Sequence, residues 1–416
     1  MSRKSYTNNR KHIYDSIRQE GIFTWDTMYG EEYALASTYA ISNAFRSEMA
    51  YATKQLGRIF HKTLQHVRLG SDQLLKELGL PRSTWPTIRL NFPYDAPTLI
   101  GRFDFAYTEQ GLKMLEFNSD TPTGIVEAFY TNGKVCEALG KQDPNEKENL
   151  KIKAGFQRIL SLYQKLGYNT KQIHFSSLNW HEEDKGTTLY LLRESGLSAV
   201  YTPLHQIGVK EDGVYAWDEQ KLQEIEVNVW YRLHALEILA EDQDVDGYAT
   251  GKHLLRLIAD QKLGIINPPS GFIGQTKALQ ALIWMLHESN LFFTAEEKEI
   301  IQTYMLPTYL DNPFLKKEAY VRKPILGREG GAVTLFDDKG DLIDKDKEEN
   351  YWDQAMIYQK YMPLQPIQTE TLKGTYEGQL LWGSFLIDGE PSAIIARVDQ
   401  GITSNLSHFL PIELKD

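Results

Sequence analysis

Two alternating segments at residues 101–118, GRFDFAYTEQGLKMLEFN, constrain the fold of this chain more than any other feature. Apolar and polar side chains alternate with the period of two that is typical of β-strands, and turn-forming residues separate the segments. A three-residue loop, Glu109-Gln110-Gly111, with Gly111 at a positive φ, would close them into a β-hairpin. The fold must therefore contain a sheet that includes this hairpin.

Four polar side chains would share one face of the hairpin. The loop sets Asp104 opposite Glu116 and Arg102 opposite Asn118, and residues two apart on a strand point to the same side. Opposed carboxylates repel one another unless a cation lies between them. Mg²⁺ takes oxygen ligands and keeps positions for phosphate oxygens, so Asp104, Glu116 and Asn118 are candidate metal ligands. Arg102 could grip an anionic substrate oxygen. The alternative is a solvated face with an Arg–Asp pair.

The segment after the hairpin favours the start of a helix. Thr121 is a good N-cap and Pro122 a good first helical residue. Free N–H groups at such a helix N-terminus bind anions. Helical patterns continue over residues 124–140 and 146–167.

The remaining patterns indicate a mixed fold. One amphipathic helix is predicted over residues 35–67 and further helix over 276–304. Short strands at 173–179 and 197–203 alternate with helical pieces, which suggests an α/β insert, and the last hundred residues are rich in strands. We expect an α/β (α+β) chain in four parts. These are a mainly helical part (1–95), the hairpin and following helices (96–170), an α/β substrate domain (171–265) and a nucleotide-binding part (266–416).

A glycine-rich segment lies between two of the late strands. Gly327, Arg328, Glu329, Gly330 and Gly331 follow the strand that ends in Lys323-Pro324. The backbone N–H groups of such a turn can close over phosphates. It is neither a Walker A loop nor a Rossmann fingerprint, because the lysine precedes the glycines and no helix follows. Any hairpin with a long glycine-rich turn would look similar, and that is the alternative.

Other candidate nucleotide contacts are scattered along the chain. Lys277 lies in a loop that opens a helix and can reach a phosphate, although a lone lysine is more often simply exposed. Gln359 and Tyr361 belong to a strand that runs into a linker, where adenine could bond to the backbone. Arg397 interrupts an apolar strand. Such a charge is usually at the surface but can also be directed at a site.

Charge and composition exclude several classes of protein. The 45 basic and 56 acidic residues give a net charge of −11, and no basic cluster of the kind that binds nucleic acid is present. An acidic field favours a cationic substrate such as a polyamine, but many proteins carry it for solubility alone. The polar start is not a signal peptide and no apolar run has membrane length, so we expect a cytoplasmic protein without a membrane partner. The single cysteine, Cys136, is expected to be a buried helix residue.

These motifs, in this order, resemble those of the glutathionylspermidine synthetases. The matching stretches are RFDF…LKMLEFNSDTPT, NPPSGFIGQTKAL, VRKPILGREGGAV and the closing strand with Arg397. The resemblance implies a permuted ATP-grasp fold, in which the metal ligands come early and the phosphate lid late. The amidase domain of the bifunctional members is missing from this sequence, so hydrolysis of the product is not expected.

The resemblance also implies roles for individual residues. ATP and Mg²⁺ would be the cofactors, with Lys277, Lys323 and the Gly327–Gly331 lid on the phosphates. Arg102 and Arg397 would stabilise the phosphorylated carboxylate and the tetrahedral intermediate. Glu183 and Asp184 fall where the family places acidic residues that attract the amine, and Thr121 and Thr123 stand where we look for serine contacts to glutathione.

The expected reaction is ATP-dependent joining of a carboxylate to an amine through an acyl phosphate. Glutathione or a related peptide and a polyamine would be the small-molecule substrates, and a homodimer is one option for the assembly. Two alternatives stay open. One is an ATP-binding homologue without catalysis, and the other is an ATP-grasp kinase that acts on a hydroxyl. Only the ligase requires both a carboxylate and an amine.

Overall fold

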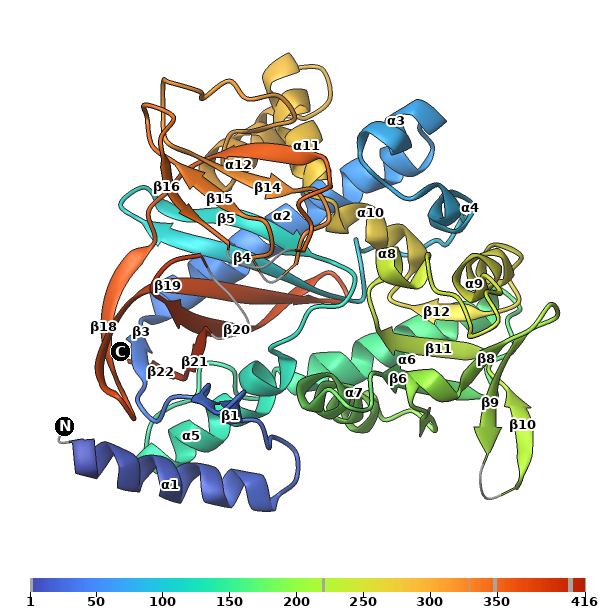
Figure 1. Cartoon of the computed structure of the whole chain (residues 1–416), viewed down its shortest axis with the longest axis horizontal. Coiled ribbons are helices and arrows are strands. Elements are labelled where there is room, and N and C mark those ends of the chain that lie inside the picture. The colour runs from blue at the N-terminus through green and yellow to red at the C-terminus, as the bar shows by residue number, and fades with distance from the viewer. Residues whose placement is uncertain (1–2, 219–220, 329, 347–349, 403–406, 416) are drawn as a thin grey trace.

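The computed structural model describes residues 3–218, 221–328, 330–346, 350–402 and 407–415. Its elements form three neighbouring groups, namely a central sheet, a smaller sheet with helices above it, and an α/β insert to one side (Figure 1). The helices are α1 (Arg3–Gln19), α2 (Asn43–Arg68), α3 (Asp72–Glu77), α4 (Trp85–Ile88), α5 (Asn132–Leu139), α6 (Asn149–Lys165), α7 (Glu182–Ser195), α8 (Leu236–Leu239), α9 (Thr250–Ala259), α10 (Phe272–Gln275), α11 (Lys277–Ser289) and α12 (Ala295–Tyr304).

The central sheet joins the hairpin to the end of the chain. Its strand order is β21-β20-β19-β4-β5, and β18 also pairs with β19. The hairpin and the late strands thus share one sheet, although they belong to separate segments of the sequence. The four domain boundaries themselves remain a prediction. The strands are β4 (Ile100–Thr108), β5 (Gly111–Asn118), β18 (Gln365–Thr371), β19 (Gly374–Ile387), β20 (Glu390–Asp399) and β21 (His408–Leu410).

The other sheets flank the central one. A five-stranded sheet, in the order β13-β17-β14-β15-β16, lies above it in Figure 1. The α/β insert holds a parallel sheet, β12-β11-β6-β7, and an antiparallel one, β10-β9-β8. Two short pairs, β1-β2 and β22-β3, complete the sheets. These strands are β1 (Thr27–Met28), β2 (Glu31–Glu32), β3 (Tyr39–Ile41), β6 (Ile173–Ser177), β7 (Val200–Tyr201), β8 (Ile207–Val209), β9 (Val214–Asp218), β10 (Gln223–Glu226), β11 (Val229–Leu233), β12 (Gly264–Ile266), β13 (Thr308–Tyr309), β14 (Tyr320–Pro324), β15 (Thr334–Phe336), β16 (Leu342–Lys345), β17 (Met356–Lys360) and β22 (Ile412–Leu414).

One long helix decides which face of the central sheet is open. Buried side chains of α2 pack against β4 and β5, and the Phe60 ring centre lies 5.5 Å from that of Phe103 and 5.0 Å from that of Phe117. Successive side chains on a strand point to opposite faces. Burial of Phe103 against α2 therefore turns Arg102 and Asp104 to the other face of the sheet.

The predicted hairpin register is correct where the polar side chains lie and wrong at the tip. Arg102 pairs with Asn118 and Asp104 with Glu116, as predicted. The register then shifts, so that the strands meet at Thr108 and Gly111 and the turn has two residues rather than three. The cause is a β-bulge at Leu115, which adds one residue to β5. Gly111 does have the predicted positive φ, 84°.

The long early helix is shorter than predicted. Residues 35–67 do not form one helix, because Tyr39–Ile41 are the strand β3, which pairs with β22, and α2 begins at Asn43. Ser42 has extended backbone, and its hydroxyl accepts a hydrogen bond from the Phe45 N–H. This N-cap fixes the start of the helix.

Two further helix predictions need correction. Thr121 is not an N-cap and Pro122 is not helical, because Gly124 has a φ of +77° and the helical segment begins at residue 125. Helical backbone requires a negative φ, so no helix can run through Gly124 in this conformation. The predicted helix over 276–304 is two helices, since α11 ends at Ser289 and its C-cap residue, Asn290, has a φ of +59°.

Cys136 is buried on α5, as predicted. In the described part of the chain, no helix combines the length and apolar character needed to cross a membrane. The cytoplasmic location and the homodimer remain predictions.

Candidate active site

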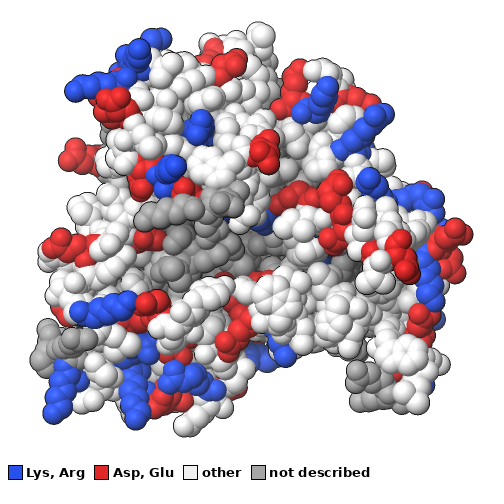
Figure 2. Space-filling view, in the orientation of Figure 1, with Lys and Arg blue, Asp and Glu red and all other residues white. Residues whose placement is uncertain are grey.

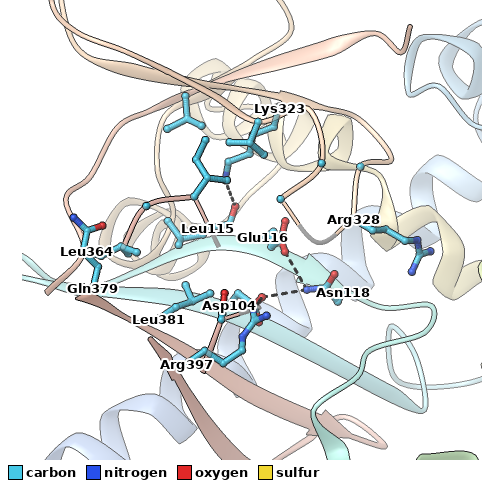
Figure 3. Close-up of a pocket in the computed structure, with 18 of the residues that line it drawn as sticks. Asp104, Leu115, Glu116, Asn118, Lys323, Arg328, Leu364, Gln379, Leu381 and Arg397 are labelled. Atoms are coloured by element: carbon cyan, nitrogen blue, oxygen red, sulfur yellow. Dashed lines mark hydrogen bonds and ion pairs between the residues drawn. The ribbon is translucent and has the colours of Figure 1, made fainter. Parts of the chain in front are cut away.

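A cavity of about 400 Å³ lies between the central sheet and the five-stranded sheet (Figure 3). Its floor is formed by β4, β5, β19 and β20 and its roof by β14, β15 and β17 with the glycine-rich turn, and residues 121–124 also line it. Figure 2 shows the molecule hollowed near the centre of one face. The predicted site residues that line the cavity are Arg102, Asp104, Glu116, Asn118, Thr121, Thr123, Glu183, Lys277, Lys323, Gly327, Arg328, Gly330, Gly331, Gln359, Tyr361 and Arg397.

The floor of the cavity is a charged face built from three strands. Asp104, almost wholly buried, lies between two arginines, with Arg102 Nε 2.6 Å from Oδ1 and Arg397 Nη2 3.1 Å from Oδ2. The Asn118 amide nitrogen lies 3.5 Å from Asp104 Oδ2 and 3.3 Å from Glu116 Oε1. The three side chains of Asp104, Glu116 and Asn118 therefore converge on one point, as the hairpin pairing predicted.

The roof brings two lysines down onto that face. Lys277 Nζ lies 3.2 Å from Glu116 Oε2 and donates to the Gly327 carbonyl at 2.6 Å. Lys323 Nζ donates to Gln359 Oε1 at 2.8 Å and to the Leu115 carbonyl at 3.3 Å. The β-bulge at Leu115 therefore contributes to the site, because the Leu115 carbonyl accepts a hydrogen bond from Lys323 in the roof.

Burial and neighbouring charges shift the acidity of these groups. Burial lowers the pKa of Lys323 to about 8, although Glu116 opposes the shift. Burial alone would raise the pKa of Glu116, but Lys277 and Lys323 outweigh it and lower that pKa to about 2. Glu116 is thus a carboxylate at every physiological pH, whereas Lys323 gives up its proton more readily than an ordinary lysine.

The balance of charge suits an anionic ligand together with a cation. Two carboxylates face four cationic groups, the side chains of Arg102, Arg397, Lys277 and Lys323, so the site carries two positive charges beyond balance. No group of three or more His, Cys, Asp or Glu side chains fit to hold a metal occurs among the described residues. Two carboxylates and an amide supply part of a shell of oxygen ligands, and phosphate oxygens and water would complete it.

The glycine-rich turn covers one end of the cavity. Gly327, Gly330 and Gly331 line it, and a Cβ on Gly327 would lie 2.3 Å from a ring carbon of Pro324, so only glycine fits at that position. Glu329 lies outside the described residues. Arg328 lines the cavity as well, but its guanidinium is already held on several sides.

Arg328 belongs to a buried network that sequence reasoning missed. Its Nε lies 2.6 Å from Glu237 Oε1 on α8, and its Nη1 donates to the Thr121 hydroxyl at 2.8 Å. Asp120, 3.5 Å from the Arg328 Nη2, is also paired with Arg232 at 2.6 Å. The turn is therefore connected through Asp120 to β11 of the α/β insert.

The other end of the cavity carries the predicted substrate residues. Glu183 of α7 lines the cavity, whereas Asp184 lies at the helix start, with Oδ1 3.1 Å from His181 Nδ1. The Thr123 carbonyl accepts a hydrogen bond of 2.6 Å from Arg102 Nη1. Tyr33, which the sequence analysis did not single out, also lines this end.

A profile of the family described as "Glutathionylspermidine synthase preATP-grasp" matches residues 4–415 of this chain. The chain belongs to this family. Membership in the glutathionylspermidine synthase preATP-grasp family confirms the resemblance drawn from the motifs. Because it is an ATP-grasp family, it implies the use of ATP.

Several named proteins are similar over most of the chain. A putative acid–amine ligase of Haemophilus influenzae is 26% identical over 76% of this chain and 74% of its own length. Trypanothione synthetase of Crithidia fasciculata is 26% identical over 88% of this chain, and the bifunctional glutathionylspermidine synthetase/amidase of Escherichia coli 25% identical over 83%. The matches span 55% and 56% of the latter two proteins.

The fold is shared more widely than the sequence. The structure of a glutathione synthetase-like effector from Globodera pallida in its apo form matches all of this chain and 98% of its own, with a TM-score of 0.60 at 12% identity. This likeness confirms the expected α/β ATP-grasp fold, and at such low identity it shows the fold alone.

The residues at or near the cavity that sequence reasoning missed had weak signals in the sequence. Arg232 is a charged residue in the apolar strand VWYRL, a pattern that indicates a paired or functional charge. Asp120 is the second residue after the hairpin. Glu237 and Tyr33 stand in stretches with no unusual pattern. Only the fold brings Tyr33 to the cavity and Glu237 to Arg328, which lines it.

Proposed function

We propose that this chain is an ATP-dependent ligase that joins a carboxylate to an amine through an acyl phosphate. The observation that supports the proposal most strongly is that charged side chains on the floor of the cavity face charged side chains on its roof. The Asp104–Glu116–Asn118 face lies opposite Lys277 and Lys323, with the glycine-rich turn beside them (Figure 3). Such an arrangement can hold a triphosphate and a divalent cation together.

In this proposal, Asp104, Glu116 and Asn118 hold Mg²⁺, and the lysines and the turn hold the ATP phosphates. The assignment is supported by the carboxylate oxygens of Asp104 and Glu116, which both lie within 3.5 Å of the Asn118 amide group, and by the positive charge of Lys277 beside them. Bound Mg²⁺ would neutralise charge on the phosphoryl group in transfer. Gln359 and Tyr361 lie along the roof, where the adenine end would meet β17.

Arg102 and Arg397 are assigned to the reacting carboxylate. The Nε of Arg397 is buried and has no hydrogen-bond partner in the described part of the protein. An unpartnered donor of this kind beside a cavity can bind the oxygen that gains charge as the tetrahedral intermediate forms. Arg102 is held by Asp104 and by the Thr123 carbonyl, so its position is fixed before a substrate arrives.

The amine is assigned to the end of the cavity that holds Glu183. A carboxylate there attracts a cationic amine, and a polyamine suits that charge. Thr121 and Thr123 line the same cavity as Glu183 and the two arginines, and a peptide such as glutathione would lie against them. The named relatives support this pair of substrate classes.

The test is incubation with ATP, Mg²⁺, glutathione and spermidine. We expect phosphate release that requires both organic substrates, and a product with the mass of glutathione plus spermidine minus one water. Phosphate release with no amine requirement would contradict the proposal and favour a kinase or an ATPase. Binding of ATP without turnover under any of these conditions would favour the homologue that binds ATP without catalysis.

A further inference from the structure

A buried carboxylate lies behind the amine end of the cavity. Glu127 sits in a π-helical turn, Glu127–Thr131, and has no exposed surface. Its Oε1 accepts hydrogen bonds from the Trp25 indole N–H at 2.8 Å and the Tyr33 hydroxyl at 3.0 Å. Its Oε2 is buried and has no hydrogen-bond partner among the described residues. A carboxylate buried in this way is costly to keep, so a function beyond structure is the better explanation.

Tyr33 connects that carboxylate to the cavity. The residue lines the cavity and is 7% exposed. Its backbone N–H donates to the Asp26 carbonyl at 3.0 Å, and its carbonyl accepts from the Phe409 N–H at 2.9 Å, which fixes the backbone that carries the ring. Because the hydroxyl proton points to Glu127, the oxygen lone pairs remain to accept a proton from a group in the cavity.

Trp25 fixes the cluster against the helix that carries Glu183. Its indole lies so close to Gly186 that a Cβ there would be 2.1 Å from a ring carbon. Glu183 and Gly186 are three residues apart on α7 and share one face of the helix. The cluster therefore holds Tyr33 and Glu127 in place relative to the wall that would attract an amine.

A ligase of this kind must remove protons from the amine before the amide can form. The amine arrives as an ammonium ion, which has no lone pair and cannot attack a carbonyl carbon. One proton must leave before attack and a second as the amide forms. The phosphate leaving group can take the second proton, and the first needs an acceptor on the protein.

We propose that Tyr33 and Glu127 form a proton-transfer pair that removes the first proton from the amine, an inference that rests on the proposed ligase function. The N–H proton passes to the phenol oxygen while the phenol proton passes to Glu127. The neutral amine attacks the acyl carbon, the C–N bond forms, and the bond from carbon to the phosphate oxygen breaks. The second proton leaves with the phosphate as hydrogen phosphate.

The acidities of both groups fit these roles. Burial raises the pKa of Glu127, against the hydrogen bonds from Trp25 and Tyr33, which makes it a better proton acceptor than an exposed glutamate. Burial also raises the pKa of Tyr33 well above its ordinary value, so the phenol relays a proton and does not rest as a phenolate. The charged groups that face this pair are Glu183 on α7, Arg102 on β4 and Arg397 on β20.

Two substitutions separate proton transfer from packing. Glu127→Gln keeps an oxygen acceptor for Trp25 and Tyr33 but cannot take a proton, and Tyr33→Phe keeps the ring but removes the relay. Each variant is assayed with ATP, Mg²⁺ and glutathione, against either spermidine or hydroxylamine. Hydroxylamine is largely unprotonated at neutral pH, so it traps an acyl phosphate without prior loss of a proton.

We expect both variants to lose about 100-fold in kcat with spermidine, the size of a general-base contribution, while hydroxamate formation stays within about twofold. The wild-type rate with spermidine should also fall at low pH as Glu127 takes up a proton, and Glu127→Gln should lack that fall. Tyr94→Phe is the matched control, because Tyr94 also donates to a carboxylate, Asp388, but does not line the cavity. It should match the wild type in both assays.

Three results would overturn the inference. Equal losses with spermidine and hydroxylamine would show that the pair supports folding or acyl phosphate formation instead. Unchanged kcat with spermidine in both variants would show that the proton leaves by another route. If the wild type forms neither product, the proposed function itself fails and the inference fails with it.

Discussion

Both carboxylates on the floor of the cavity are held by neighbouring cations. Asp104 is held by Arg102 and Arg397, and Glu116 by Lys277 and Asn118. Neither carboxylate is therefore buried without a partner before a ligand arrives. These contacts also hold each donor in place, which is what electrostatic stabilisation of a transition state requires.

Removal of one floor carboxylate should be severe for catalysis. Glu116→Gln keeps the size of the side chain and its contact with Asn118 but removes a charge from the proposed Mg²⁺ site. We expect kcat to fall on the order of 100-fold, the effect of losing one strong electrostatic contact at a reacting group. Steady-state assays over a range of Mg²⁺ concentrations measure it. Full activity at ordinary Mg²⁺ would show that Glu116 is not a ligand.

ATP binding should weaken in alkaline solution because of Lys323. Burial lowers the pKa of Lys323 to about 8, so the group is charged below that pH and neutral above it. The attraction to phosphate is therefore complete below pH 8 and is lost as the pH rises through it. We expect the Kd for ATP to be flat below pH 8 and to rise by up to about tenfold per pH unit above it.

Lys323→Arg supplies the control for this titration, because arginine keeps its charge throughout. Its Kd, measured by calorimetry, should show no rise near pH 8. A flat profile in the wild type, or the same rise in the arginine variant, would contradict the assignment of Lys323 to the phosphates.

At the scale of elements, the hairpin shows what alternation can and cannot predict. Alternation predicted which side chains share a face, whereas the pairs Asp104–Glu116 and Arg102–Asn118 were predicted from a three-residue loop. The pairs are correct because the extra residue in β5 offsets the shorter, two-residue turn. The bulge at Leu115 was not predictable, because an extra residue in one strand leaves composition and turn signals unchanged. The prediction that Thr121 is an N-cap was wrong for a similar reason. The residue types at 121 and 122 favour a helix start, but they do not reveal that Gly124 has a positive φ.

The glycine-rich turn should loosen when its link to α8 is weakened. Glu237 holds the Arg328 guanidinium through two contacts, at 2.6 and 3.1 Å. Hydrogen bonds to charged groups contribute about 1.5–3 kcal/mol, so Glu237→Gln should speed amide hydrogen exchange in residues 326–328 by about tenfold or more. Glu390→Gln is the control, because Glu390 forms an exposed ion pair with Lys54 and should change nothing there. Equal exchange in both variants would show that the turn does not depend on Glu237.

At the scale of the molecule, the insert and the central sheet are joined through buried polar contacts. Asn267, which follows β12, accepts from the Ile100 N–H at 2.9 Å and donates to the Ile100 carbonyl at 3.0 Å and the Asp120 carbonyl at 2.7 Å. The hydrogen bonds of Asn267 connect β12 to the start of the hairpin, and the ion pair between Arg232 and Asp120 connects β11 to the segment that follows it. Local patterns could not predict these contacts, because the residues that form them lie in separate segments of the sequence.

Loss of the Asn267 hydrogen bonds should lower the stability of the whole protein. Asn267→Ala leaves the Ile100 N–H and its carbonyl buried without their partner, at about 1–3 kcal/mol for each orphaned group. We expect the free energy of unfolding in urea to drop by about 3 kcal/mol. Asn169→Ala, at an exposed position, should stay within about 0.5 kcal/mol of the wild type. Similar losses in the two variants would show that the contacts of Asn267 contribute little.

The proposed reaction passes through an acyl phosphate, and transfer of ¹⁸O tests that step directly. The peptide substrate is labelled in both oxygens of its reacting carboxylate and incubated with ATP, Mg²⁺ and the amine. An acyl phosphate route predicts one ¹⁸O atom in each phosphate released, and one retained in each amide. Unlabelled phosphate released together with amide would contradict the account, because the carboxylate would then never have been phosphorylated.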